Sequence, residues 1–286
     1  MKLSQSKIYS KSSFFWIPTY YDQKNDIYFC VPENRDFVNK FYQGKYWDDF
    51  ARKAKKNTFW KYIELILDFF NIPDTGNYKN INLLKKQWHL TKSSKILEIW
   101  SGQGNCIKYL SKKWYNIQGV EIDTKNIEHI KNEIWKDIMV EWNYEDIKLD
   151  QKYDIIYLKH VLEHFYDLET IITKLKNNLT DKWIIFIDVP DCGKKRILDR
   201  SIMKHPHIYH FTKKSLINIF KEQNLECIYL DTYQRLNANI SRVQSINSLY
   251  RILIRFLHIP IVSKNIDDNN KEPHDLVAIF EKNKSK

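Results

Sequence analysis

The stretch from Lys95 to Leu110 constrains the fold of this chain more than any other segment. Its first part, Ile96 to Ile99, is an apolar run typical of a short strand buried in a parallel sheet. Gly102 and Gly104 then interrupt the run, and a helical pattern follows. A strand, a glycine turn and a helix together bring a nucleotide-like ligand against bare backbone and the N-terminus of the helix. The segment therefore predicts an α/β domain with a nucleotide-type binding site at this turn.

The rest of the chain predicts a doubly wound α/β fold. Strand and helix patterns alternate after Lys95, which favours a mostly parallel, Rossmann-like sheet with helices on both faces. Seven strands are expected, at residues 96–99, 117–122, 138–141, 155–158, 184–189, 226–230 and 276–281.

Several motifs resemble those of one enzyme family. With Glu98 inside the strand, the first segment resembles the E-x-G-x-G-x-G signature of class I S-adenosylmethionine (SAM)-dependent methyltransferases, although Trp100 stands at the first glycine. Residues 153–167 resemble fDvvxxxxvLEHvxd, a segment frequent in the ubiquinone-type and small-molecule branch, and residues 205–216 resemble pHxxhFtxxsL. The resemblance covers about residues 95–282. It implies the seven-stranded methyltransferase sheet with an antiparallel last strand, and methyl transfer from SAM to a small-molecule or glycan-precursor acceptor.

The resemblance assigns the SAM site to the carboxyl ends of the first two strands. The turn from Trp100 to Gly104 would bring backbone to the methionine portion and the ribose, where a Cβ atom would collide. Glu98 would hold this loop or face the ligand amine, and an acid at the end of the second strand would accept the ribose hydroxyl protons. Glu121 is the first candidate for this acid and Asp123 the second. The cofactor residues expected in these two strands are Glu98, Trp100, Ser101, Gly102, Gly104, Glu121 and Ile122.

Two further segments complete the implied cofactor site. Asn143 would bond the adenine edge and Tyr144 would stack on it, although a surface turn fits these residues almost as well. Lys159 and His160 would lie at the carboxyl end of the fourth strand, beside the methyl group.

Histidines supply the candidate base. His207 and His210 would lie on the acceptor side, where a neutral imidazole can take a hydroxyl proton; a purely structural role is the alternative. His160 and His164 are four residues apart, a spacing compatible with a metal, but no H-E-x-x-H pattern is present and no metal is expected.

Tryptophan stands at several positions where glycine is usual. The chain has six glycines and nine tryptophans, whereas glycine makes up about 7% of an ordinary domain. The tryptophans in question follow or begin strands or lie at helix ends: Trp88, Trp100, Trp114, Trp135, Trp142 and Trp183. Bulky indoles at positive-φ turns would be strained. We therefore expect a genetic code in which the codon UGA means glycine; the alternative is genuine tryptophan placed for packing.

Two parts of the chain are expected. Residues 1–90 form an N-terminal extension that either lines an acceptor pocket or caps the sheet. Residues 91–286 form the methyltransferase domain, with an insertion at about 232–274. Within the insertion, residues 246–261 predict a basic amphipathic helix that packs on its own domain, or else serves as a lid, a partner surface or a peripheral membrane contact.

The extension carries its own local patterns. Residues 8–31 alternate apolar and polar side chains, which predicts one or two short strands with a turn at residues 22–26. Helical periodicity follows at residues 36–42, 48–70 and 80–90.

Composition narrows the classes of partner. The formal net charge is +11, but the lysines are spread along the chain and no nucleic-acid-binding motif accompanies them, so a nucleic-acid partner is not expected. The four cysteines show no C-x-x-C pair, which favours reduced thiols in a cytoplasm over zinc or disulfides. The sequence predicts a soluble protein, because it has neither a signal-peptide core nor the run of ~20 apolar residues that a membrane span requires.

Two other functions remain open. A Rossmann oxidoreductase also uses a strand, a glycine turn and a helix, but Cys106 and Ile107 stand where G-x-G-x-x-G requires its third glycine. A methyltransferase-like scaffold without activity would follow if the indole of Trp100 is genuine, because that side chain would fill or distort the cofactor turn.

Overall fold

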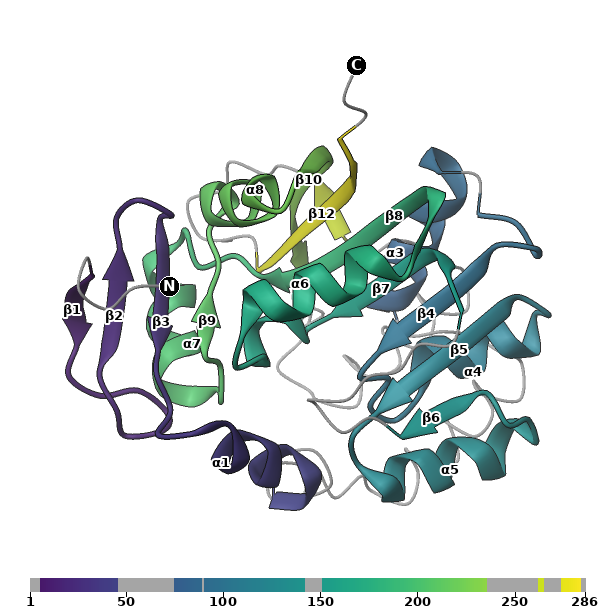
Figure 1. Ribbon diagram of the computed structural model, residues 1–286, viewed down its shortest axis with the longest axis horizontal. Coiled ribbons are helices and arrows are strands. Elements are labelled where there is room, and N and C mark those ends of the chain that lie inside the picture. The colour runs from purple at the N-terminus through teal and green to yellow at the C-terminus, as the bar shows by residue number, and fades with distance from the viewer. Residues whose placement is uncertain are drawn as a thin grey trace, which may run out of the picture. The chain divides into compact units, whose positions relative to one another are not determined.

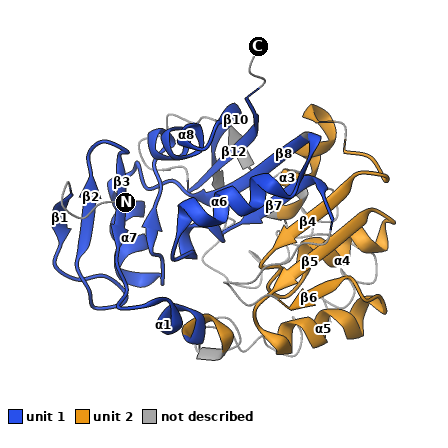
Figure 2. Ribbon diagram, in the orientation of Figure 1, with its two compact units in different colours: residues 1–40, 148–234, 264–286 blue, residues 41–147, 235–263 orange. Residues whose placement is uncertain are grey.

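The chain is described from a computed structural model (Figure 1), which covers residues 6–45, 75–88, 90–141, 151–235, 262–264 and 274–283. It forms two compact units (Figure 2): unit 1 contains residues 1–40, 148–234 and 264–286, and unit 2 contains residues 41–147 and 235–263. Strands and helices alternate in both units, which confirms the predicted α/β class. The division predicted at residue 90 is not tested by this grouping and stays a prediction.

Unit 2 is built on a three-stranded parallel sheet. Its strands, in spatial order, are β4 (Lys95–Ile99), β5 (Asn116–Glu121) and β6 (Met139–Glu141). The last four residues of β4 are buried, as expected for a strand covered on both faces.

Helices pack on this sheet through apolar stripes. The helices among the described residues of the unit are α3 (Thr75–Gln87), α4 (Asn105–Lys112) and α5 (Thr124–Ile134), with a short π-helix at Phe41–Lys45. Gly119 of β5 lets α4 approach closely, because a Cβ atom there would lie 2.5 Å from Cδ1 of Ile107. The glycine is therefore part of the packing that holds β4, α4 and β5 together.

Unit 1 contains a sheet with the strand order β10-β12-β8-β7. These strands are β7 (Tyr153–Lys159), β8 (Leu179–Pro190), β10 (Leu225–Arg235) and β12 (Asp275–Lys282). β7 and β8 are parallel, whereas β12 runs antiparallel to both β8 and β10. The seven predicted strands are thus all present, and the antiparallel last strand is confirmed.

The helices of unit 1 follow the predicted alternation. They are α1 (Arg35–Lys40), α6 (Leu168–Asn177), α7 (Lys195–Lys204) and α8 (Lys213–Glu222), with a 3-10 turn at Leu162–His164. The α8 helix packs on β12 through Phe220 and Phe280, whose stacked rings have centroids 4.1 Å apart.

A second, antiparallel sheet begins in the N-terminal part of unit 1. Its order is β1 (Lys7–Ser10), β2 (Thr19–Asp22), β3 (Ile27–Cys30) and β9 (Tyr209–His210). The prediction of one or two strands before residue 31 was too low, because three are present, and β1 leaves most of its residues exposed. The two-residue β9 has no strand-like sequence pattern of its own and is defined by pairing with Tyr28 and Phe29.

Some predicted elements lie outside the described residues. These are the helices at 48–70 and 246–261, and most of the insertion at 232–274, of which β11 (Val262–Lys264) is described. The β10 strand continues to Arg235, so residues 232–235 belong to the sheet. Among the described helices none combines the length and the apolar character needed to cross a membrane.

Candidate functional site

The turn after β4 in unit 2 has the backbone of a binding loop. Trp100, Gly102 and Gly104 all have positive φ, at 52°, 55° and 75°. Gly104 precedes α4 without a side-chain cap, and its N–H donates to the carbonyl of Ser101 at 2.8 Å. A Cβ atom on Gly104 would lie 2.6 Å from Cγ1 of Ile130, so both the conformation and the space require glycine there.

Glu121 ties this turn to the end of β5. One carboxylate oxygen, Oε2, accepts a hydrogen bond from the N–H of Gly102 at 2.7 Å. The other, Oε1, accepts from the N–H groups of Ile122 and Asp123 at 2.9 and 3.0 Å. Burial raises the pKa of Glu121 to about 7, and these three donors offset part of that rise. The carboxyl group is therefore held in a fixed place beside the glycine turn and titrates near neutral pH.

The neighbouring predicted residues occupy buried positions in the same unit. Glu98 in β4, Ser101 in the turn and Ile122 after β5 are all less than a tenth exposed. Asp123 caps α5, because its Oδ1 accepts a hydrogen bond from the N–H of Asn126 at 2.9 Å. Of the two acids proposed for the ribose, Glu121 is thus the one not engaged as a helix cap.

Trp100 interacts with an aromatic ring within unit 2. Its ring centroid lies 5.0 Å from that of Tyr42, with the planes tilted by 46°. Asn143 and Tyr144, predicted to contact adenine, lie outside the described residues.

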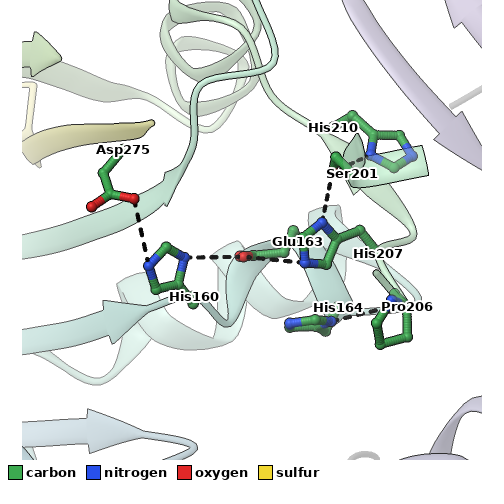
Figure 3. Close-up of polar contacts among 8 residues, drawn as sticks. All are labelled: His160, Glu163, His164, Ser201, Pro206, His207, His210 and Asp275. Carbon is green, nitrogen blue, oxygen red and sulfur yellow. Dashed lines mark hydrogen bonds and ion pairs between the residues drawn. The ribbon is translucent and has the colours of Figure 1, made fainter. Parts of the chain in front are cut away.

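A cluster of histidines and carboxylates lies in unit 1, and we call it the histidine cluster (Figure 3). It brings together side chains from the residue after β7, the following 3-10 turn, α7, the loop before β9, β9 itself and the start of β12. Its members are His160, Glu163, His164, Ser201, His207, His210 and Asp275.

His160 is the most exposed imidazole of the histidine cluster. Its side chain is 31% exposed, and its ring nitrogens lie 3.6 Å from Oε1 of Glu163 and 3.8 Å from Oδ1 of Asp275. Burial disfavours the charged imidazole, but the carboxylates of Glu163, Asp188 and Asp275 outweigh it and raise the pKa of His160. Its φ is 53°, so the backbone after β7 turns sharply here. Lys159, predicted beside it, is half-buried as the last residue of β7.

Ser201 joins the two histidines that were predicted as bases. Its Oγ lies 2.7 Å from Nδ1 of His207 and 2.8 Å from Nδ1 of His210. A hydroxyl has one proton and two acceptor lone pairs, so Oγ donates a hydrogen bond to at most one of these nitrogens and accepts one from the other. Burial holds the pKa of His207 well below its usual value and lowers that of His210 to about 3, so both imidazoles are neutral at pH 7.

Glu163 lies between His160 and His207 in the histidine cluster (Figure 3). The residue is 1% exposed, and its Oε1 lies 3.6 Å from Nδ1 of His160 and 3.9 Å from Nε2 of His207. The carboxyl group is therefore next to both imidazoles.

Several donor atoms of unit 1 are close enough to hold a metal ion. Glu163, His164 and His207 form one such group, and His160, Asp188 and Asp275 form another, with ligand atoms within 4.8 Å of one another in each. In the first group, Nδ1 of His164 already pairs with the carbonyl of Pro206 at 3.1 Å, which fixes the ring. Neither group was marked by a metal-binding motif in the sequence.

Sequence reasoning missed Ser201, Asp188 and Asp275 as members of this region. Ser201 lies within a helical pattern and Asp275 opens a strand, so neither has a local signal. Asp188 precedes the Val-Pro-Asp segment and could have been found as an acid at the end of a parallel strand.

Comparison with known proteins gives the family. Residues 56–230, more than half of the chain, match a family model described as a methyltransferase domain. The chain belongs to this family. The match spans the glycine turn after β4, Glu121 and all members of the histidine cluster except Asp275.

Solved structures support the same fold. The chain resembles magnesium protoporphyrin IX methyltransferase from Synechocystis PCC 6803, with bound SAH, at 9% identity and a TM-score of 0.53, covering 87% of this chain and 100% of that chain. It also resembles coclaurine N-methyltransferase bound to N-methylheliamine and SAH, at 12% identity and a TM-score of 0.51, covering 72% of this chain and 70% of the other. At these identities the likeness establishes the class I methyltransferase fold.

A curated relative matches a shorter stretch. The tRNA (uracil(54)-C(5))-methyltransferase of Pyrococcus abyssi is 27% identical over 118 residues, which is 41% of this chain. The match spans 28% of the length of that relative.

Proposed function

We propose that this chain transfers a methyl group from SAM to a small-molecule or glycan-precursor acceptor. The observation that carries the proposal is the hydrogen bond between Glu121 and the N–H of Gly102, because it holds a buried carboxylate beside a glycine turn. Ribose hydroxyls pair with an acid at this position in nucleotide-binding α/β folds. Membership in the methyltransferase family, and the SAH bound in two proteins of the same fold, support SAM as the cofactor.

In this proposal the turn and its surroundings hold the cofactor. Glu121 accepts hydrogen bonds from the ribose hydroxyls, and the backbone of residues 100–104 contacts the methionine portion and the ribose. Asn143 hydrogen-bonds the edge of the adenine, and Tyr144 stacks on its ring. The remaining residues that we assign to the cofactor are Glu98, Ser101, Ile122, Lys159 and His160.

The reaction is a direct displacement. A lone pair on an oxygen, nitrogen or carbon atom of the acceptor attacks the methyl carbon, the bond between carbon and sulfur breaks, and its electron pair stays on sulfur. An oxygen acceptor also gives up a proton to a base. Most of the rate would come from alignment of the acceptor with the methyl group.

Exposure favours His160 over His207 and His210 as the base. A base must reach the acceptor proton, and the side chain of His160 is 31% exposed, whereas His207 and His210 as residues are 8% and 1% exposed. His207 then acts through Glu163, whose Oε1 it faces at 3.9 Å, and His210 acts through Ser201, whose hydroxyl lies between it and His207. This assignment moves the role predicted for His207 and His210 to a neighbour within the same cluster.

Calorimetric titration with SAM tests the proposal. We expect the W100G variant to bind SAM, and Glu121→Ala in that background to weaken binding by about tenfold to a hundredfold, the usual effect of losing hydrogen bonds to a charged group. Glu141→Ala is the matched control, because Glu141 pairs with Glu121 across β5 and β6 but is exposed. Failure of W100G to bind SAM, or equal losses in both glutamate variants, would refute the proposal. If NAD bound in this titration and SAM did not, a Rossmann oxidoreductase would be favoured.

A further inference from the structure

Four tryptophans have a backbone conformation that favours glycine. Trp16, Trp100, Trp114 and Trp135 have φ of 61°, 52°, 63° and 53°. The other non-glycine residues with positive φ in the described part of the chain are Asp26, His160 and Asn224. Asp, Asn and His are the residue types most often found there, because their short polar side chains tolerate the left-handed region, whereas a bulky residue is an outlier.

We propose that the natural protein contains glycine at positions 16, 100, 114 and 135, because its codons there are read as glycine. The sequence alone indicated glycine at six tryptophan positions. Positive φ is found at three of those six, and also at Trp16, which no motif had marked.

Trp114 stands where helices most often end in glycine. It follows the last turn of α4, and its N–H donates to the carbonyl of Ser111 at 3.0 Å. The N–H of Tyr115 donates to the carbonyl of Leu110 at 3.1 Å. These two bonds form a Schellman motif, whose left-handed residue is usually glycine. The indole of Trp114 is 77% exposed, so burial does not compensate for the conformation.

Trp135 ends α5 in the related single-bond motif. Its N–H donates to the carbonyl of Lys131 at 3.0 Å, and its backbone is left-handed. The residue is 91% exposed. Two successive helices of unit 2 therefore end on a left-handed, exposed tryptophan.

Trp16 closes a turn in unit 1. Its N–H donates to the carbonyl of Ser13 at 3.0 Å, and the residue is 88% exposed. Here too the backbone turns as glycine allows, and the indole lies mainly in solvent.

Trp100 lies in the turn that the proposed function assigns to SAM. It is followed by Gly102 and Gly104, which share its positive φ. Three left-handed residues within five positions form a turn that only glycine adopts without strain. Glycine at position 100 follows from the backbone conformation alone. Only the consequence, which is room for SAM at this turn, rests on the proposed function.

Trp88 and Trp183 are not included. Neither has positive φ, and Trp183 is buried within β8 with 5% of its surface exposed. Trp142 lies outside the described residues. The backbone thus separates positions that require glycine from positions where tryptophan is compatible with the structure.

Two measurements test the proposal without any methyl-transfer assay. The codons at the four positions are read from the gene, and peptides spanning them are weighed by mass spectrometry in protein purified from the source cells. TGA codons together with glycine-containing peptides would support it. TGG codons, or peptides that retain tryptophan at these positions, would overturn it.

A stability comparison provides a readout that does not require the source organism. In the chain as printed, W114G and W135G are each compared with W114A and W135A. Alanine removes the same indole but keeps a Cβ atom, so glycine should give the higher melting temperature at both sites. Equal or lower melting temperatures for the glycine variants would contradict the inference. SAM binding by W100G tests the proposed function separately.

Discussion

The carboxylate of Glu121 accepts a hydrogen bond of 2.7 Å from the backbone N–H of Gly102. The bond links the end of β5 to the turn that follows β4, so the acid and the glycine turn form one rigid element of unit 2. Because the acceptor is buried, its protonation state is coupled both to folding and to the binding of any ligand that donates hydrogen bonds to it.

Stability should fall as pH rises through the titration range of Glu121. Its pKa is raised from 4.5 to about 7 in the folded chain, so the folded state holds the proton more tightly than the unfolded state. The loss develops between these two pKa values and amounts to roughly 3 kcal/mol. Glu121→Gln should remove this dependence, as measured by urea unfolding at pH 4.5, 6 and 8. A Gln variant with the same pH profile as the parent would show that another group is responsible.

SAM binding should respond to pH in the opposite direction. Ribose hydroxyls donate to the charged carboxylate, so affinity for SAM in the W100G background should rise as pH increases from 6 to 8 and Glu121 ionises. The same calorimetric series with Glu121→Gln should show no such rise. A pH-independent affinity in the presence of Glu121 would place the ribose elsewhere.

Asp123→Ala should destabilise α5 by about 1 kcal/mol. Its side chain caps the helix through the N–H of Asn126, and removal of such a cap typically costs 0.5–2 kcal/mol. Glu128→Ala, an exposed change within the same helix, is the control and should have little effect on the melting temperature. If Asp123→Ala were to abolish SAM binding without loss of stability, Asp123 would be a ligand residue and the cap a secondary role.

Ser201→Ala should destabilise unit 1 by about 1–3 kcal/mol. The hydroxyl is the partner of two buried imidazole nitrogens, and both lose it at once. Denaturant unfolding followed by circular dichroism measures the change, with the exposed Ser93→Ala as control. An unchanged midpoint would mean that the two histidines find other partners.

His160→Asn should slow methyl transfer to hydroxyl acceptors by about a hundredfold or more, because general-base catalysis contributes 10²–10⁴. Asparagine tolerates the positive φ of this position, so the variant should keep its fold. Transfer of labelled methyl from SAM, in the W100G background, to a panel of phenols, sugars and amines measures the effect. Amine acceptors with a free lone pair should be less affected. If His207→Asn or His210→Asn alone gave the loss, the base would be the one first predicted from the sequence.

Much of the candidate site was visible in local sequence. The glycines that follow β4 and the acid that ends β5 are about 20 residues apart. This spacing reflects one helix between two parallel strands. The two-residue β9 was not predicted, because it is too short to show periodicity, and three strands lie before residue 31 where one or two were predicted.

The sequence by itself determined the seven strands and the pairing of a glycine turn with Glu121, since a strand pattern is local and the spacing between the turn and the acid reflects one helix between two parallel strands. Only the tertiary structure brought Asp275 against His160, because these residues are distant in sequence. It also placed Ser201 between His207 and His210, because nothing in the helical pattern around Ser201 marks that contact, although the three residues are close along the chain. It also decided which tryptophans occupy left-handed backbone, because φ depends on the hydrogen bonds that close each turn and helix end, and the identity of the residue alone does not set it.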